Sequence, residues 1–149
     1  MLLVADVHGA YAALARVARQ GEPLLVLGDF LNLVDYRDGS GLLCDLFGRD
    51  LVQEVLHLRQ QGGPGAANQR WQAWALGREE EISQRYDGLV RAAYEEVAEA
   101  LQGAEAYVTH GNADRPRLLR ACLPPGVRYV DGGIVEIDGL RVGIVGGGP

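Results

Sequence analysis

The sequence contains no lysine, and all 14 of its basic residues are arginine. A Walker A phosphate loop and a Schiff-base enzyme both require a lysine amine, so neither can be built from this chain. Hydroxyl side chains are also scarce, since there are two serines, Ser40 and Ser83, and one threonine, Thr109. Neither serine lies in a G-x-S-x-G turn, and this disfavours serine-triad hydrolysis.

Cysteines, long apolar runs and basic clusters are few or absent as well. Cys44 and Cys122 give no disulfide framework, and no run of about 18 apolar residues offers a membrane span. The N-terminal MLLVAD is strand-like and carries no basic, cleavable leader. With 20 acidic residues the formal charge is −6, which disfavours docking on nucleic acid or on an anionic membrane. We therefore expect a cytoplasmic protein.

The 149 residues are enough for one globular domain with a sizeable core. Apolar strand-like runs alternate with helical patterns, which is typical of an α/β fold. The expected strands are residues 2–6, 23–27, 106–109, 127–130, 134–137 and 140–145, the last two joined by an Asp138-Gly139 hairpin turn. The expected helices are residues 11–20, 51–61 and 71–102, and a short helix that begins at Asp114-Arg115-Pro116 and ends at Ala121.

The stretch between the second and third strands is longer than a crossover requires. Asp29 and Asn112 are 83 positions apart, whereas a whole βαβ unit takes about 30 residues. We therefore expect a helical insertion at residues 37–103, packed beside the sheet, in which Gly77 and Asp87-Gly88 could interrupt the last helix. The amphipathic period predicts a buried apolar face made of Leu51, Val55, Leu58, Leu89, Val90 and Val97.

Polar residues follow the first three predicted strands. Asp6 and His8 are two apart in what reads as an extended segment, so both side chains should project to the same side. Gly28-Asp29 and Gly111-Asn112 end the next two strands, and the carboxyl ends of parallel strands form the ligand crevice of an open sheet. Two carboxylates, an imidazole and an amide oxygen suit Mn, Fe or Zn. The helix that follows Gly9 adds a positive N-terminal end for an oxyanion.

Each of these residues also has an ordinary structural interpretation. Asp6 and Asp29 could be helix N-caps, and a single histidine such as His8 is more often an exposed loop residue than a ligand. Asn112 could be a plain turn residue, and an N-cap role for Asp114 has the same weight as a catalytic one.

The motifs D-V-H-G, G-D and G-N-x-D, each closing a strand in this order, resemble the calcineurin-like metallophosphoesterases from Asp6 to Asp114. The resemblance implies a β-sandwich core flanked by helices and the hydrolysis of phosphodiesters or phosphomonoesters. It implies a dinuclear centre of Mn, Fe or Zn, with a metal-bound hydroxide as the nucleophile. Asp6 and His8 would bind the first ion, Asp29 would bridge both, and Asn112 would bind the second ion and contact the phosphate.

The third motif departs from the family pattern. Many members read G-N-H-D, where the histidine protonates the leaving group, but this chain has Ala113. Either the leaving group needs no acid, or His110 or a later residue supplies the proton. The catalytic candidates are therefore Asn112, Asp114 and His110.

Two further departures concern the other motifs. Asn32 stands where the family often has another acid, and we count Asn32 and Gly9 as candidate substrate contacts. The later histidines of the family, including a final G-H-x-H pair, do not occur within residues 1–149. We therefore expect a domain that lacks its C-terminal part, binds metal weakly by itself, and can self-associate through the exposed edge of its last strand.

Two rival functions follow from the same residues. An aspartyl-phosphate protein also gathers acids at strand ends around Mg²⁺, but it needs a lysine opposite the phosphate. A catalytically degenerate relative could instead use the crevice to bind a nucleotide or a partner protein, and Ala113 favours this alternative.

Overall fold

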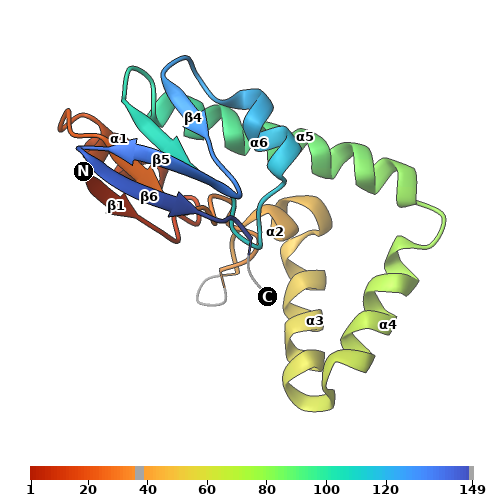
Figure 1. The fold of residues 1–149 in the computed structure, drawn as a ribbon. Coiled ribbons are helices and arrows are strands. Elements are labelled where there is room, and N and C mark those ends of the chain that lie inside the picture. Colours follow the sequence, from red (N-terminus) through yellow and green to blue (C-terminus); the bar gives the residue numbers. More distant parts are fainter. Residues whose placement is uncertain (36–38, 148–149) are drawn as a thin grey trace. The chain divides into compact units, whose positions relative to one another are not determined.

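The computed structural model describes residues 1–35 and 39–147 (Figure 1). The chain divides into two compact units. The first, which we call the α/β unit, contains Met1–Asn32 and Val90–Pro149, and the second, the helical unit, contains Leu33–Leu89. The α/β unit holds all of the predicted site motifs.

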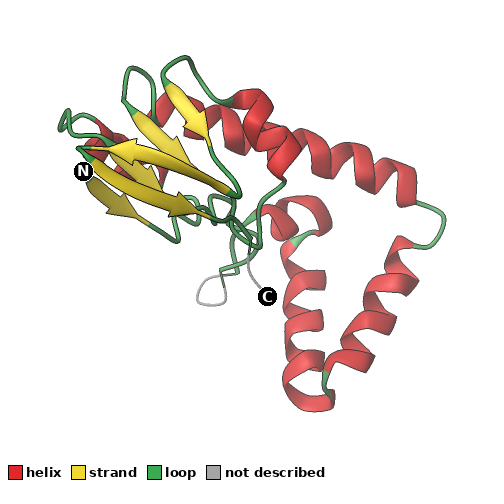
Figure 2. Cartoon of the chain, viewed as in Figure 1, coloured by secondary structure: helices red, strands yellow, loops and turns green. Residues whose placement is uncertain are grey.

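A four-stranded parallel sheet forms the centre of the α/β unit (Figure 2). Its strands lie side by side in chain order, and they are β1 (Leu2–Val4), β2 (Leu24–Val26), β3 (Ala106–Val108) and β4 (Val127–Tyr129). Every residue of β2 and β3 is buried, as expected for inner strands of a parallel sheet that is covered on both faces. The predicted α/β class is therefore confirmed.

An antiparallel hairpin covers one face of this sheet. Its strands are β5 (Gly133–Ile137) and β6 (Leu140–Ile144). Asp138 and Gly139 both have positive φ, 51° and 76°, as a two-residue type I′ turn requires. The layer between hairpin and sheet is an apolar cluster of Leu25, Tyr107, Ile137 and Ile144, with Val130, Val135 and Val142 packed against it. In the described part of the chain, β6 pairs with β5 alone.

Helices cover the opposite face of the sheet, as Figure 1 shows for α1 (Tyr11–Ala18) and α5 (Glu79–Ala100). A third helix, α6 (Pro116–Cys122), follows the loop after β3 and has Pro116 at its first position, where no amide hydrogen bond is lost. The helical side chains buried in this unit are Leu14, Ala18, Val90, Ala93, Tyr94, Val97, Ala100 and Leu119.

The helical unit contains α2 (Leu42–Phe47), α3 (Arg49–Gly62), α4 (Pro64–Ala75) and the beginning of α5. Gly63 has a φ of 75° and Pro64 opens α4, so the chain turns sharply between α3 and α4. One apolar cluster of this unit consists of Leu51, Val55 and Ala67, with Phe47, Leu58, Trp71 and Trp74 packed against it. Leu42, Leu46 and Val52 are buried as well.

The predicted insertion is helical, but its boundaries differ from the prediction. Its expected first residue, Arg37, lies outside the described residues. The helix expected at residues 71–102 is two helices, because the chain turns at Gly77, whereas Gly88 stays within α5. Val90 and Val97 are buried in the α/β unit, and Leu58 and Leu89 are only half-buried.

Helix α5 is the longest described helix, with 22 residues. Neither α5 nor any other helix in the described ranges combines the length and the apolarity that crossing a membrane requires.

Candidate metal centre

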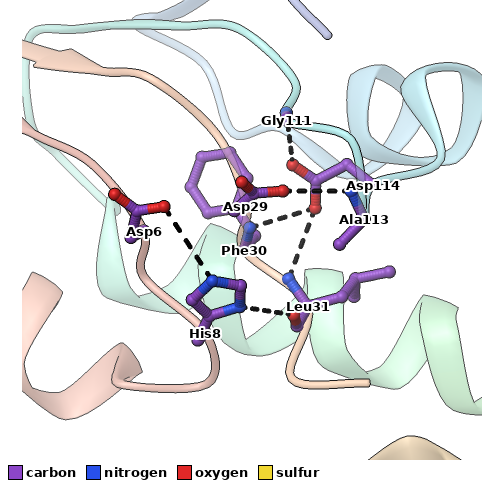
Figure 3. A network of polar contacts seen from close by, with 8 residues as sticks. All are labelled: Asp6, His8, Asp29, Phe30, Leu31, Gly111, Ala113 and Asp114. Atoms are coloured by element: carbon purple, nitrogen blue, oxygen red, sulfur yellow. Dashed lines mark hydrogen bonds and ion pairs between the residues drawn. The ribbon is translucent and has the colours of Figure 1, made fainter. Parts of the chain in front are cut away.

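Three of the predicted ligands come together at the carboxyl edge of the sheet (Figure 3). Asp6 follows β1, Asp29 follows β2, and His8 lies two residues beyond Asp6. One ligand atom from each side chain lies within 4.8 Å of the other two. The His8 and Asp6 side chains are 50% and 74% exposed, so the cluster is open to solvent. Among the described residues, no other group of three His, Cys, Asp or Glu side chains meets this criterion.

All three cluster residues have left-handed backbone conformations. The φ angles of Asp6, His8 and Asp29 are 54°, 39° and 51°, and the one other non-glycine residue with positive φ in the described ranges is the hairpin residue Asp138. Such a conformation costs about 1–2 kcal/mol per residue. The expected extended segment from Asp6 to His8 is therefore wrong, because β1 ends at Val4 and the chain turns instead.

Main-chain hydrogen bonds hold the loop after β1 against the loop after β2. The amide of His8 donates to the carbonyl oxygen of Asp29 at 2.7 Å, and the amide of Gly9 donates to that of Phe30 at 3.0 Å. The Tyr11 hydroxyl, at the start of α1, donates to the same Phe30 oxygen at 3.1 Å. These bonds stabilise the left-handed turns and bring His8 to Asp29.

The His8 ring is oriented by a backbone acceptor. Its Nδ1 atom lies 3.2 Å from the carbonyl oxygen of Leu31. A carbonyl oxygen only accepts hydrogen bonds, so Nδ1 carries a proton, and in the neutral ring Nε2 then keeps its lone pair. Nε2 faces Asp6 Oδ1 at 3.9 Å. This is the arrangement that orients metal-binding histidines in proteins.

The third motif contacts Asp29 through its backbone. The amide of Ala113 donates to Asp29 Oδ1 at 3.0 Å, and a Cβ placed on Gly111 would overlap that same carboxylate. Asn112 is exposed and lies between these two contacts in the chain. The structure thus brings Asp6, His8 and Asp29 together and places the backbone of Asn112 beside them.

The glycines of the second and third motifs are required by close backbone approach. A Cβ on Gly28 would overlap the backbone of His110 and Gly111, whereas a Cβ on Gly21 would meet nothing within 4 Å. Both Gly21 and Gly28 have positive φ, 79° and 87°, so the two positions share the backbone strain and differ in the steric clash.

We expect Gly28→Ala to destabilise the fold by several times the effect of Gly21→Ala, for which the left-handed strain alone predicts about 1–2 kcal/mol. Urea denaturation of the two variants measures the difference. A variant of Gly28 that does not fold agrees with this expectation, and equal losses at the two positions would contradict it.

Asp114 is buried and joins the loop after β2 to the loop after β3. Its Oδ1 accepts the amides of Phe30 at 3.0 Å and Leu31 at 3.3 Å, and the hydroxyl of Tyr94 at 3.3 Å. Its Oδ2 accepts the amide of Gly111 at 2.9 Å. The side chain is therefore an acceptor for three amides that the strand-end loops would otherwise leave without a partner.

The N-cap interpretations do not hold for the acids at the strand ends. The N-cap residues of α1, α2 and α6 are Ala10, Gly41 and Arg115, and none of the three helices has a side-chain cap hydrogen bond.

Burial raises the pKa of the Asp114 carboxyl above its ordinary range, against the lowering effect of the three backbone amides, and nearby Asp29 raises it further.

His110 packs at the end of β3 and is not part of the three-residue cluster. Its Nδ1 atom lies 2.7 Å from the Tyr129 hydroxyl and 4.0 Å from a carboxylate oxygen of Asp131. The backbone of Gly146 covers the ring so closely that a Cβ there would lie 2.5 Å from Nδ1. The His110 ring is therefore enclosed by Tyr129, Asp131 and the backbone of Gly146.

The expected oxyanion site at the start of α1 has few free donors. The amides of Gly9, Ala10 and Tyr11 already donate to carbonyl oxygens of the chain. Asn32 packs against Gly9, because its Cβ lies 3.2 Å from where a Cβ on Gly9 would be. Gly9 and Asn32 thus shape the turn after His8.

The phenol of Tyr11 is expected to lose its proton at a higher pH than an ordinary tyrosine. Burial, then Glu96 and Asp114, raise the pKa of its phenol from 10 to about 12. A group whose pKa is higher in the folded chain stabilises the fold below its unfolded pKa, so this contribution is present below about pH 10 and is lost towards pH 12. The absorbance difference at 295 nm between wild type and Tyr11→Phe should show one phenol with a midpoint near pH 12. A midpoint near pH 10 would contradict the expectation.

Sequence reasoning missed Tyr94. It lies in the same helical stripe as Val90 and Val97, and it reads as an ordinary apolar position. The one available signal is general, since a buried tyrosine needs a partner for its hydroxyl. A tyrosine within the buried stripe of α5 therefore predicts a buried acceptor, which the structure identifies as Asp114.

Comparison of the chain with known protein families, with curated proteins and with solved structures gives no match. The functional interpretation therefore depends on the geometry of the site and on the three motifs.

Proposed function

We propose that this chain is a metal-dependent phosphoesterase of the calcineurin-like type, acting on phosphodiesters or phosphomonoesters. The observation that carries the proposal is the cluster of Asp6, His8 and Asp29 at the carboxyl ends of neighbouring parallel strands. The contact between Asp29 and the G-N-x-D loop adds support, and so does the small antiparallel sheet packed on the parallel one.

The donor set fits Mn, Fe or Zn. Two carboxylates and an imidazole are ligands that these ions accept. The His8 tautomer set by Leu31 leaves Nε2 free to bind a cation. Strained backbone at all three ligands is typical of functional sites, where the surrounding structure holds a geometry that the chain would not adopt alone.

Asp29 is the best placed of the three to serve two cations. An ionised carboxylate has about four lone-pair sites, and the bond from Ala113 uses one of them. Divalent ions held at this centre would activate a water molecule and polarise the phosphoryl oxygens. Asp6 and His8 would hold the first ion, and Asn112 is the candidate ligand for the second. Ala113 has no proton to give the leaving group and His110 is not part of the three-residue cluster, so we expect esters with acidic leaving groups to be the best substrates.

The test is hydrolysis of bis-p-nitrophenyl phosphate with Mn²⁺, combined with analysis of bound metal. We expect slow turnover that needs the ion, disappears with EDTA, and is lost in Asp6→Ala and His8→Ala. Turnover that survives both variants would overturn the proposal. Metal binding without turnover at saturating Mn²⁺ would favour the alternative, a degenerate relative that binds a nucleotide or a partner protein.

A further inference from the structure

We propose that Tyr94 of α5 is a positioning residue for the candidate metal centre. It acts through Asp114 on the loop that carries Asp29 and orients His8. The inference rests on the proposed function, since it assigns Tyr94 a part in holding the ligands of that centre.

The Tyr94 hydroxyl contacts two successive residues of the loop after β3. The side chain is fully buried. Its hydroxyl donates to Asp114 Oδ1 at 3.3 Å and accepts the amide of Arg115 at 2.6 Å. One oxygen thus fixes both the carboxylate of Asp114 and the backbone that follows it, just before α6 begins.

A short chain of contacts leads from Tyr94 to the ligands. Asp114 Oδ1, which receives the Tyr94 hydroxyl, also accepts the amides of Phe30 and Leu31. These residues follow Asp29 directly, and the Leu31 carbonyl oxygen is the acceptor for His8 Nδ1. The orientation of the His8 ring therefore depends on a backbone segment that Asp114 holds.

Packing alone does not account for this hydroxyl. Val90 and Val97, four residues before and three after Tyr94 on the same stripe of α5, are buried without any polar atom. A phenylalanine would fill the same volume, and a buried hydroxyl is unfavourable unless it is hydrogen-bonded. The hydroxyl adds a third donor to the carboxylate oxygen that faces Phe30 and Leu31, and so it helps to fix the plane in which the Asp114 carboxylate receives the loop amides.

The test compares Tyr94→Phe with Tyr107→Phe. Tyr107 is also largely buried, 5% exposed, but belongs to the cluster under the hairpin, so Tyr107→Phe controls for the loss of a tyrosine hydroxyl that does not bond Asp114. Two measurements use the metal-free chain at about pH 8, where histidine is ordinarily neutral. The first is the imidazole ¹⁵N spectrum of His8, which reports its tautomer, and the second is hydrogen exchange of the Phe30 and Leu31 amides.

We expect Tyr94→Phe to mix the two His8 tautomers, to accelerate exchange at both amides, and to weaken Mn²⁺ binding by about tenfold, the lower end of what the loss of an outer-shell partner causes. Tyr107→Phe should leave all three unchanged. A single His8 tautomer and wild-type exchange in Tyr94→Phe would overturn the inference. If the wild type binds no Mn²⁺, the proposed function fails, and the metal-free measurements still decide whether Tyr94 positions His8.

Discussion

Replacing Asp29 by alanine is expected to abolish binding of the second divalent ion and nearly all phosphoesterase activity. Asp29 lies between the ligands of the first loop and the backbone of the third, and one of its oxygens is already fixed by the Ala113 amide. In the described part of the chain no other Asp or Glu belongs to the cluster besides Asp6. A bridging charge that is removed here has no replacement, and the two cations would repel each other.

Titration calorimetry with Mn²⁺ measures this effect. Asp29→Asn is the more informative variant, because its amide oxygen can still accept the Ala113 bond while the charge is lost. Asp50→Ala, an exposed acid of the helical unit, is the control and should bind as the wild type does. Equal stoichiometry for wild type, Asp29→Ala and Asp29→Asn would exclude the bridging role.

Asp114→Ala is expected to destabilise the α/β unit more than any other loss of an acid. Asp114 is 8% exposed, and its carboxylate accepts three backbone amides and the Tyr94 hydroxyl. Each buried donor left without an acceptor costs about 1–3 kcal/mol. A loss of at least about 3 kcal/mol therefore follows, even if water satisfies some of the donors.

Urea denaturation provides the measurement, with Asp131→Ala as a matched control. Asp131 also accepts one backbone amide, that of Gly146 at 2.9 Å, but it is exposed, so its loss should cost less than about 1 kcal/mol. If the two variants lose the same stability, Asp114 does not hold the loops as described.

The sequence predicted the position of the site better than its internal geometry. Asp6, Asp29 and Asn112 could be placed because each follows an apolar run, and parallel strands end at one edge of a sheet. The left-handed backbone at Asp6 and His8 could not be predicted, because it is imposed by hydrogen bonds to residues of another loop. Local sequence would have kept the first strand extended to Asp6.

The role of Asp114 was beyond sequence reasoning for a similar reason. An aspartate just before a Pro-initiated helix is typical of an N-cap. Here it is buried instead, because Tyr94, distant in sequence, and the backbone of Phe30 and Leu31 converge on it. Burial of a carboxylate depends on such tertiary partners. The local pattern therefore identified Asp114 as a candidate residue but could not predict its contacts.

In the helical region, too, the sequence predicted the buried positions better than the ends of the helices. Apolar spacing identified Leu51 and Val55 as core positions, and both are buried. The ends of the helices depended on single residues, since the chain breaks at Gly77 but not at Gly88. A Cβ would meet nothing within 4 Å at either glycine, so the difference lies in backbone conformation, with a φ of 75° at Gly77.

The most direct test of the metal centre is anomalous diffraction at the manganese edge from crystals of the chain grown with Mn²⁺. The account predicts an anomalous peak bounded by Asp6, His8 and Asp29, with His8 Nε2 and carboxylate oxygens as direct ligands of the ion. A peak elsewhere on the chain, or none at these three residues at saturating Mn²⁺, would contradict it.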